Sequence, residues 1–503
     1  MHCSIWDTWI TQKQFGTRGK KPASRSSVSN RHCEADLFAL FWLLLAATSI
    51  CTILSGPLAG FWTALLLAAL GVTLRSRSMV FYSCLILILS FFISFQAEKG
   101  QLWIGLEGPE FLEVRSLRDS RPAGEGSLHF FELIRVYDRR GNRAEARGEF
   151  LGWSRDRLDL PWGAELLVRS SGIPGRESSG GLVVVEPQDT AAGVPEGFRL
   201  RNSWRQGLLY RLNRLPPQAS VLMEALLFGS KQRLLSPLEE GFRAIGCSHL
   251  LALSGMHLAV IMAVGAGLFG LILRKRVARF LVLLILPWYL FLVGPSPALL
   301  RAGIMFSCTV LIPRSTRRIR TRELLLQSFV FLLLIKPDYL FDRGFQYSYA
   351  ALAGMISLTP LVLKFVARIL PYSIAAGFSS GVSAYLGSLP VSLLAYGTTN
   401  PVGIIATLIL SPLIWLYLAG GILFFLLPGS AMVYQGARLF FWLLYSGIRG
   451  IVELFSHVSP CILLPVPAAV LALGAGLVIT VQLIYSCLRF TMPEPDGREA
   501  WSE

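Results

Sequence analysis

The stretch His249–Leu258, HLLALSGMHL, places two histidines, a serine and a glycine at the head of an apolar run that continues to Leu273. Histidine and serine side chains can transfer protons or act as a base and its nucleophile. At 100° per residue, His249, Ser254 and His257 fall within about 140° of arc on one helix. Polar groups are costly in hydrocarbon and are kept where they contact protein, water or a solute. These residues are therefore the first candidates for chemistry.

Three interpretations of this arc stay open. Neutral and charged histidine are close in energy near pH 7, so the arc could line a path or form a pH-sensitive gate. Ser254 and His257 are neighbours on a helix and could form an intramembrane hydrolase, although the local ALSG lacks the GxSG of rhomboid-like proteases. In the structural interpretation each histidine is hydrogen-bonded to a neighbouring helix, and Gly255 allows close helix contact.

A metal site is not predicted. Metal-assisted hydrolysis needs several His and carboxylate ligands around one ion. The six histidines form no HxHxDH motif, and the eight cysteines show no CxxC or other metal spacing. We expect no metal, no cofactor and no catalytic residue in this chain.

The elements that position the histidines belong to a membrane protein. Of 503 residues, 53% are hydrophobic and 16% are charged, and the mean hydropathy is +0.54, which is too apolar for a soluble protein of this length. A spanning helix needs roughly 20 apolar residues. Runs of about that length include Leu37–Ser55, Met79–Phe95, His249–Leu273, Ile404–Leu427 and Ala468–Leu488. We predict a polytopic α-helical membrane protein.

The net charge of +16 has two explanations, a surface for a polyanion such as DNA or the gathering of Lys and Arg in cytoplasmic loops. The basic clusters fall between the apolar runs, so we assign most of the charge to topology. This predicts a basic cytoplasmic tail over residues 1–36, N-terminal transmembrane helices over 37–96, and a cytoplasmic C-terminal tail over 491–503. The segment from 97 to 197 then lies outside the cytoplasm.

Segment 97–197 has a β pattern. Five short candidate strands are separated by turn residues, and the turn Asp138–Arg143 has Gly141 to supply positive φ. The candidate strands are Phe111–Leu117, Ser127–Tyr137, Arg143–Gly152, Gly163–Ser170 and Leu182–Val185. Five strands predict an inserted small β-barrel of OB type, and a β-sandwich fragment fits nearly as well.

Basic and apolar residues alternate at helical spacing from Phe198 to Leu215, which predicts an amphipathic helix in the membrane interface over 198–218, in contact with lipid. Pro216 and Pro217 should end it. The next segment, to Ile245, is too charged to span.

Further polar residues are candidates along the later helices. Arg301 begins a span and could meet phosphate, or it could snorkel or pair with Asp338 or Asp342. Gln346 and Tyr347, followed by Tyr349, open the next helix and fit either a pore lining that stacks bases or an interfacial aromatic belt.

Two more segments of the later helices are ambiguous. Gly377–Gly381 fits helix packing. The pair Ser411-Pro412 predicts either a broken helix beside a solute path or a simple kink.

Several segments occur in the order typical of one family. Ser248–Leu258 (SHLLALSGMHL), preceded by LLFGS and LSPLEEGFRAIG, resembles the central signature of the ComEC competence-protein family. Further matches are PSPALLRAGIMF (Pro295–Phe306), FDRGFQYSYAALAGMI (Phe341–Ile356) and SLPVSLLAYGTTNPVGIIATLILSPL (Ser388–Leu413). PWGAELLVRSSG (Pro161–Gly172) is similar to the β domain of that family. Two departures are Met256 for a leucine and the lack of a histidine after Tyr396.

The resemblance implies a function in natural transformation. Members move one DNA strand through the inner membrane while the other strand is degraded outside, and many carry a metallo-β-lactamase-like domain proposed as the nuclease. This sequence has no such motif, so we expect a separate polypeptide to perform that step. Residues 219–490 would form a competence-type transmembrane channel domain.

We therefore predict a cell (inner) membrane channel that translocates single-stranded DNA, with the β domain receiving or guiding the strand. Expected partners are single-stranded DNA, lipids, a separate nuclease, a DNA receptor and a cytoplasmic translocation ATPase; a homo-oligomer stays open. An intramembrane hydrolase, and an envelope anchor whose β domain binds a partner, are the alternatives. Candidate lining or gating residues are His249, Ser254, Gly255, His257, Arg301, Gln346, Tyr347 and Tyr396.

Overall fold

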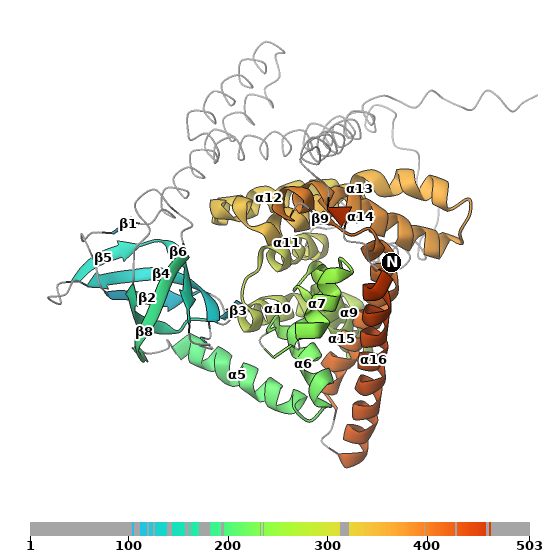
Figure 1. The fold of residues 1–503 in the computed structure, drawn as a ribbon. Helices are drawn as coiled ribbons and strands as arrows, with labels where there is room; N and C mark the ends of the chain where they lie inside the picture. The colour runs from blue at the N-terminus through green and yellow to red at the C-terminus, as the bar shows by residue number, and fades with distance from the viewer. Residues whose placement is uncertain are drawn as a thin grey trace, which may run out of the picture.

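The fold consists of a small β domain followed by a larger helical part (Figure 1). The computed structural model describes residues 103–104, 111–117, 120–123, 126–137, 143–155, 160, 162–170, 182–192, 196–231, 233–234, 236–311, 321–396, 398–427, 430–458 and 462–463. The predicted spans Leu37–Ser55, Met79–Phe95 and Ala468–Leu488 and both predicted tails lie outside these residues, as does most of the Asp138–Arg143 turn.

The β domain is a small, mostly antiparallel sheet. Its strands are β1 (Trp103–Ile104), β2 (Phe111–Ser116), β3 (Arg121–Ala123), β4 (Gly126–Tyr137), β5 (Arg143–Arg147), β6 (Glu149–Ser154), β7 (Glu165–Ser170) and β8 (Leu182–Ala192). The long strand β4 pairs with β2, β3, β5 and β6. Strand β7 pairs with β2 and β8, and β8 runs parallel to β6.

Alternating apolar residues build the core of this sheet. Every second residue of β2 is buried, and Leu112 and Val114 pack with Phe131 and Val136 of β4. This is the period of two that a β-strand imposes on its side chains. The predicted single strand Arg143–Gly152 is wrong in one respect, because Gly148, at φ 131°, separates β5 from β6. Glycine tolerates that conformation without a steric penalty.

The helical part begins with α5. Its helices are α5 (Glu196–Leu212), α6 (Pro217–Phe228), α7 (Ser236–Ala244), α8 (Ser248–Leu251), α9 (Gly255–Ile272), α10 (Lys275–Val293), α11 (Pro297–Leu311), α12 (Thr321–Ile335), the 3-10 helix η1 (Pro337–Phe341), α13 (Arg343–Val366), α14 (Tyr372–Tyr396), α15 (Val402–Phe424) and α16 (Ala431–Val458). A short β9 (Thr398–Thr399) pairs with β10 (Ile462–Leu463).

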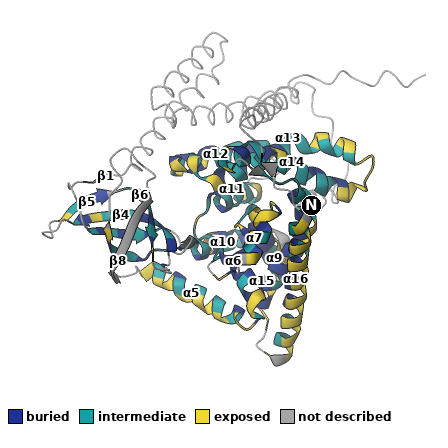
Figure 2. Cartoon of the chain, in the orientation of Figure 1, coloured by how far each residue is buried: buried dark blue, intermediate teal, exposed yellow. Residues whose placement is uncertain are grey.

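Five of the described helices, α9, α13, α14, α15 and most of α16, are long and apolar enough to cross a membrane. Many of their apolar side chains are exposed, as on α16 (Figure 2), which suits contact with lipid. The chain is therefore a multi-pass helical membrane protein, as predicted.

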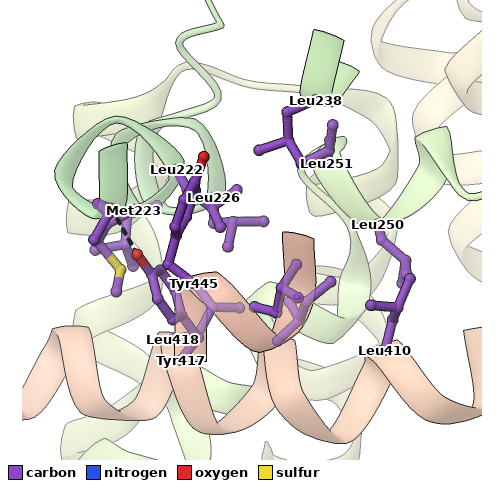
Figure 3. Close-up of a cluster of buried hydrophobic side chains, with 14 of the residues drawn as sticks. Leu222, Met223, Leu226, Leu238, Leu250, Leu251, Leu410, Tyr417, Leu418 and Tyr445 are labelled. Carbon is purple, nitrogen blue, oxygen red and sulfur yellow. Dashed lines mark hydrogen bonds between the residues drawn. The ribbon is translucent and has the colours of Figure 1, made fainter. Parts of the chain in front are cut away.

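The core of the helical part surrounds α6. Residues 222–228 are all buried, against α15 and α16. Met223 and Tyr417 face each other in this cluster (Figure 3), and the Tyr417 hydroxyl donates a 2.6 Å hydrogen bond to the carbonyl oxygen of Ala219. Gly421 leaves room for the Met223 side chain, because a Cβ atom there would lie 2.4 Å from the Met223 sulfur. The segment predicted as too charged to span therefore supplies a buried core helix.

Among the described helices, α13 and α14 pack most closely. A Cβ atom on Gly354 would lie 2.4 Å from the carbonyl oxygen of Ser383, and one on Gly387 would lie 2.4 Å from that of Ala350. Small residues at a membrane helix crossing allow such backbone contact.

Two predicted features of the helices are wrong, and one of the two interpretations of Ser411-Pro412, the broken helix, is excluded. The predicted continuous span His249–Leu273 is interrupted between α8 and α9, where Ala252 and Ser254 have extended backbone. Pro412 lies inside the uninterrupted helix α15, so the pair Ser411-Pro412 does not break it. Helix α5 ends at Leu212, and Pro217 stands in the first turn of the next helix, where its missing N–H has no cost.

Helix α5 joins the β domain to the helical part (Figure 1). Arg201 Nε donates 3.0 Å hydrogen bonds to the carbonyl oxygens of Phe291 and Leu292, at the C-terminal end of α10. Arg211 donates to the carbonyl oxygen of Phe425, just past α15, at 2.7 Å. Cations at helix C-termini are favourable. Two arginines therefore fasten α5 across the ends of two apolar helices.

Candidate functional site

Ser254 and His257 close the first turn of α9. Ser254 is the N-cap and His257 the third helical residue, and together they form a reciprocal capping box. The Ser254 backbone N–H donates to His257 Nδ1 at 3.2 Å, and the Ser254 Oγ atom lies 2.9 Å from the same nitrogen. The predicted proximity of these residues is confirmed, and helix capping accounts for it.

The capping geometry determines which histidine nitrogen carries the proton. Because a backbone N–H can only donate, Nδ1 of His257 is an acceptor and the proton belongs on Nε2. His257 is fully buried, and its Nε2 has no hydrogen-bond partner within the described part of the chain. An unmatched buried donor is unfavourable and is a feature to be explained.

His249 does not join this pair, so the predicted arc of three polar residues is wrong. It is exposed on α8, and its Nε2 lies 3.5 Å from the Thr407 hydroxyl on α15. The extended residues between α8 and α9 break the helical phase that the prediction assumed.

The turn between α7 and α8 packs on the start of α15. Gly246, at φ 73°, lies against Asn400, whose side chain donates to the carbonyl oxygen of Ala244. Gly403 lies under the same turn, and a Cβ atom there would be 2.9 Å from the carbonyl oxygen of Ile245. Sequence reasoning missed these residues, although both segments were quoted among the matched motifs. Their glycines were the available signal for close approach.

Arg301 is the polar centre of α11. Its Nη1 donates a 2.5 Å hydrogen bond to the carbonyl oxygen of Ser348 on α13, and its guanidinium lies 5.7 Å from the Tyr349 ring centre. The Tyr349 hydroxyl in turn donates a 3.0 Å hydrogen bond to the Ser328 hydroxyl on α12. The suggested pairing with Asp338 or Asp342 is wrong, since Asp342 instead caps α13 by accepting from the Phe345 N–H.

Gly255 brings Arg301 to the start of α9. A Cβ atom on Gly255 would lie 3.3 Å from Arg301 Nη2 and 3.2 Å from the Ala302 Cβ. The structure therefore brings together four of the predicted residues, Ser254, Gly255, His257 and Arg301, at one helix end.

The other predicted residues lie elsewhere. Gln346 donates its side-chain N–H to the carbonyl oxygen of Leu340 at 2.8 Å. Tyr347 forms a hydrogen bond with Ser392 of α14 and interacts electrostatically with Tyr396. Tyr396 is 65% exposed. These three contacts join α13 to its flanking elements.

The β domain carries compensated charges on its outer face. Arg115 on β2 is paired with Glu132 and Glu165, and Arg135 on β4 is paired with Glu113. Cross-strand pairs of opposite charge stabilise a sheet. Each named arginine therefore has a carboxylate partner that a nucleic acid would have to replace.

A buried histidine occupies the other side of the sheet. His129 lies between the hydroxyls of Ser120 and Ser154, at 2.9 and 2.8 Å, and has no exposed surface. Burial lowers the pKa of His129 to about 4, because desolvation disfavours the imidazolium. This imidazole is neutral at pH 7.

A family model described as "Competence protein" matches residues 226–491, and so includes the capping box and Arg301. The chain is 28% identical over 286 residues to "ComE operon protein 3" of Bacillus subtilis, covering 55% of this chain and 36% of that protein. It is 29% identical over 255 residues to an uncharacterized protein of Aquifex aeolicus, covering 48% of this chain and 55% of that protein. No solved structure matches the chain.

Proposed function

Because this chain belongs to the competence protein family, we propose that it is a channel subunit for DNA uptake in natural transformation. Single-stranded DNA would pass through its helical part into the cytoplasm. The observation that carries the proposal is the polar site at the start of α9, where Arg301 and the capping box lie among apolar helices of the matched region. Such groups are expensive in a membrane unless they serve a path or a partner.

The β domain would lie outside the cytoplasm as an OB-like barrel that receives the strand. Successive pairing of β2, β4, β6, β8 and β7, with β7 returning to β2, supports this barrel. The parallel pair β6–β8 sets this sheet apart from a simple meander. Since the arginines named on its outer face are compensated by carboxylates, the domain would guide DNA weakly and without reading its sequence.

Helix α5 would lie in the membrane interface. It crosses the ends of two apolar helices through Arg201 and Arg211, and such ends mark the level of the headgroups. Trp204 and Tyr210 on α5 are exposed, and Trp204 lies 6.5 Å from the exposed Trp288 of α10. Exposed Trp and Tyr are typical of a membrane interface.

The remaining partners follow from the same role. A separate nuclease would degrade the second strand, a DNA receptor would supply the strand outside, and a cytoplasmic ATPase would draw it inward. The chain could act as a homo-oligomer.

Deletion of the gene in a transformable host tests the proposal. Labelled DNA should still bind the cell surface, but no label should become protected from externally added nuclease. Normal accumulation of protected label in the deletion strain would overturn the proposal.

An intramembrane hydrolase is the second candidate, and the 2.9 Å contact of Ser254 with His257 favours it. A nucleophile also needs donors that stabilise an oxyanion. Loss of a peptidase activity of the purified chain on Ser254→Ala, at unchanged thermal stability, would favour this candidate.

A further inference from the structure

We infer that the first turn of α9 and the Arg301 guanidinium form a binding site for a phosphodiester group, and that this group belongs to the transported strand. The assignment to DNA rests on the proposed function, whereas the phosphate site itself does not.

The first observation is a cation without an acidic partner. Arg301 Nε is enclosed and has no hydrogen-bond partner among the residues that the structure describes. Throughout the described ranges no carboxylate pairs with Arg301, whose contacts are the Ser348 carbonyl oxygen and the Tyr349 ring. An enclosed charge that lacks a counter-charge is costly, which calls for an anion at this point.

The second observation is the state of the helix end beside it. The capping box uses the N–H of His257 and that of Ser254. Within the described ranges, the N–H groups of Gly255 and Met256 are then the donors that the first turn leaves without a partner. Both residues are half-buried, so the turn stays accessible from one side. Helix α9 has 18 residues, and its N-terminal end carries partial positive charge.

These two positive groups converge. Gly255 leaves the space in which Nη2 of Arg301 approaches the helix end, since a Cβ atom would lie 3.3 Å from it. A guanidinium and a helix N-terminus repel each other unless an anion lies between them. A phosphodiester has one negative charge and two free oxygens, which suit the guanidinium fork and two backbone N–H groups.

Thermal stability of the purified full-length chain tests the phosphate site. At constant ionic strength, replacing chloride by inorganic phosphate should raise the Tm of the wild type. Arg301→Gln should abolish the rise. Gly255→Ala keeps every charge and should reduce the rise, because the added methyl group would lie 3.3 Å from Arg301 Nη2 and displace the guanidinium from the helix end. Arg211→Gln, which removes a part-buried arginine hydrogen bond at another helix end, should keep the rise. An equal rise in the wild type and in both site variants would overturn the site.

Binding of labelled oligo(dT) to the chain in nanodiscs tests the source of the phosphate. The plot of log binding constant against log salt concentration has a negative slope. Its magnitude should decrease by about 0.7 in Arg301→Gln, the value for one single-strand phosphate contact, and should stay unchanged in Arg301→Lys. An unchanged slope with a lost phosphate response would overturn the DNA assignment alone. A phosphate response that phosphatidylglycerol nanodiscs remove would assign the site to lipid instead. If DNA uptake does not depend on the gene while phosphate still raises the Tm, the proposed function is overturned and the phosphate site still stands.

Discussion

The guanidinium of Arg201 lies 5.0 Å from the ring centre of Trp162, which joins α5 to the β domain. Trp162 also packs edge-on against Phe198 of α5, and a Cβ atom on Gly294, after α10, would lie 3.6 Å from its ring. The same guanidinium bonds the end of α10. One buried arginine therefore contacts three parts of the molecule. A second link is the ion pair between Glu149 of β6 and Lys336 after α12.

Arg201→Gln should loosen the β domain. The change removes charge-assisted hydrogen bonds and a cation–π contact, with a cost of about 2–3 kcal/mol. The variant should show a lower Tm and faster proteolysis between the two domains. Arg199→Gln, at an exposed position on the same helix, is the control and should change neither. Equal effects of the two variants would contradict this role of Arg201.

Gly354→Ala should separate α13 from α14. The added methyl carbon would lie 2.4 Å from a backbone oxygen, which forces the helices apart and costs about 1–3 kcal/mol as overpacking. A thermal melt in detergent measures the loss. Gly447→Ala is the matched control, since nothing lies within 4 Å of that position on α16. It should be neutral or slightly stabilising through helix propensity. An unchanged Tm in Gly354→Ala would show that α13 and α14 do not pack as closely as described.

The β domain should lose stability in acid through His129. Its pKa falls from 6.5 to about 4 on folding, so between these values the unfolded state binds a proton that the folded state does not. Stability is then complete above pH 6.5 and declines as the pH falls towards 4. Unfolding of the full chain, followed by tryptophan fluorescence at pH 7.5 and 5, measures the decline. His129→Gln should flatten this dependence, and an unchanged dependence would exclude His129 as its source.

Two substitutions at Ser254 separate capping from chemistry. Ser254→Ala removes the cap oxygen and should cost about 1 kcal/mol, whereas Ser254→Asn keeps a good cap. If Ser254 acts only as a cap, Ser254→Ala should lower both the Tm and the uptake of labelled DNA. Ser254→Asn should then match the wild type in both. If Ser254→Asn folds normally but fails in uptake, the hydroxyl itself has a role.

The sequence predicts most of the architecture because its main signals are periodic. Short segments between turn residues predicted strands β2 and β4, which the structure buries in alternation. Long apolar runs predicted the spans α9 and α15. Proximity of Ser254 and His257 was also predictable, because residues at this spacing meet at the start of a helix.

The remaining features have no local signal. Arg201 and Arg301 bond backbone carbonyl oxygens from distant segments, and every residue type carries a carbonyl. A prediction limited to side chains therefore looked for Asp338 and Asp342. The interruption before α9 is equally hidden, because Ala252 and Leu253 continue the apolar pattern across it. Pro412 is tolerated within α15, as proline often is in membrane helices.

Cross-linking during uptake tests the central claim, that the strand passes the start of α9. A photoreactive residue replaces Met256, next to Gly255 in the first turn of α9, or Leu443, on the exposed face of α16. In cells that take up labelled DNA, light should yield a covalent adduct of single-stranded DNA with the probe at 256 and none with the probe at 443. DNA that becomes nuclease-protected in those cells without any adduct at 256 would contradict the account.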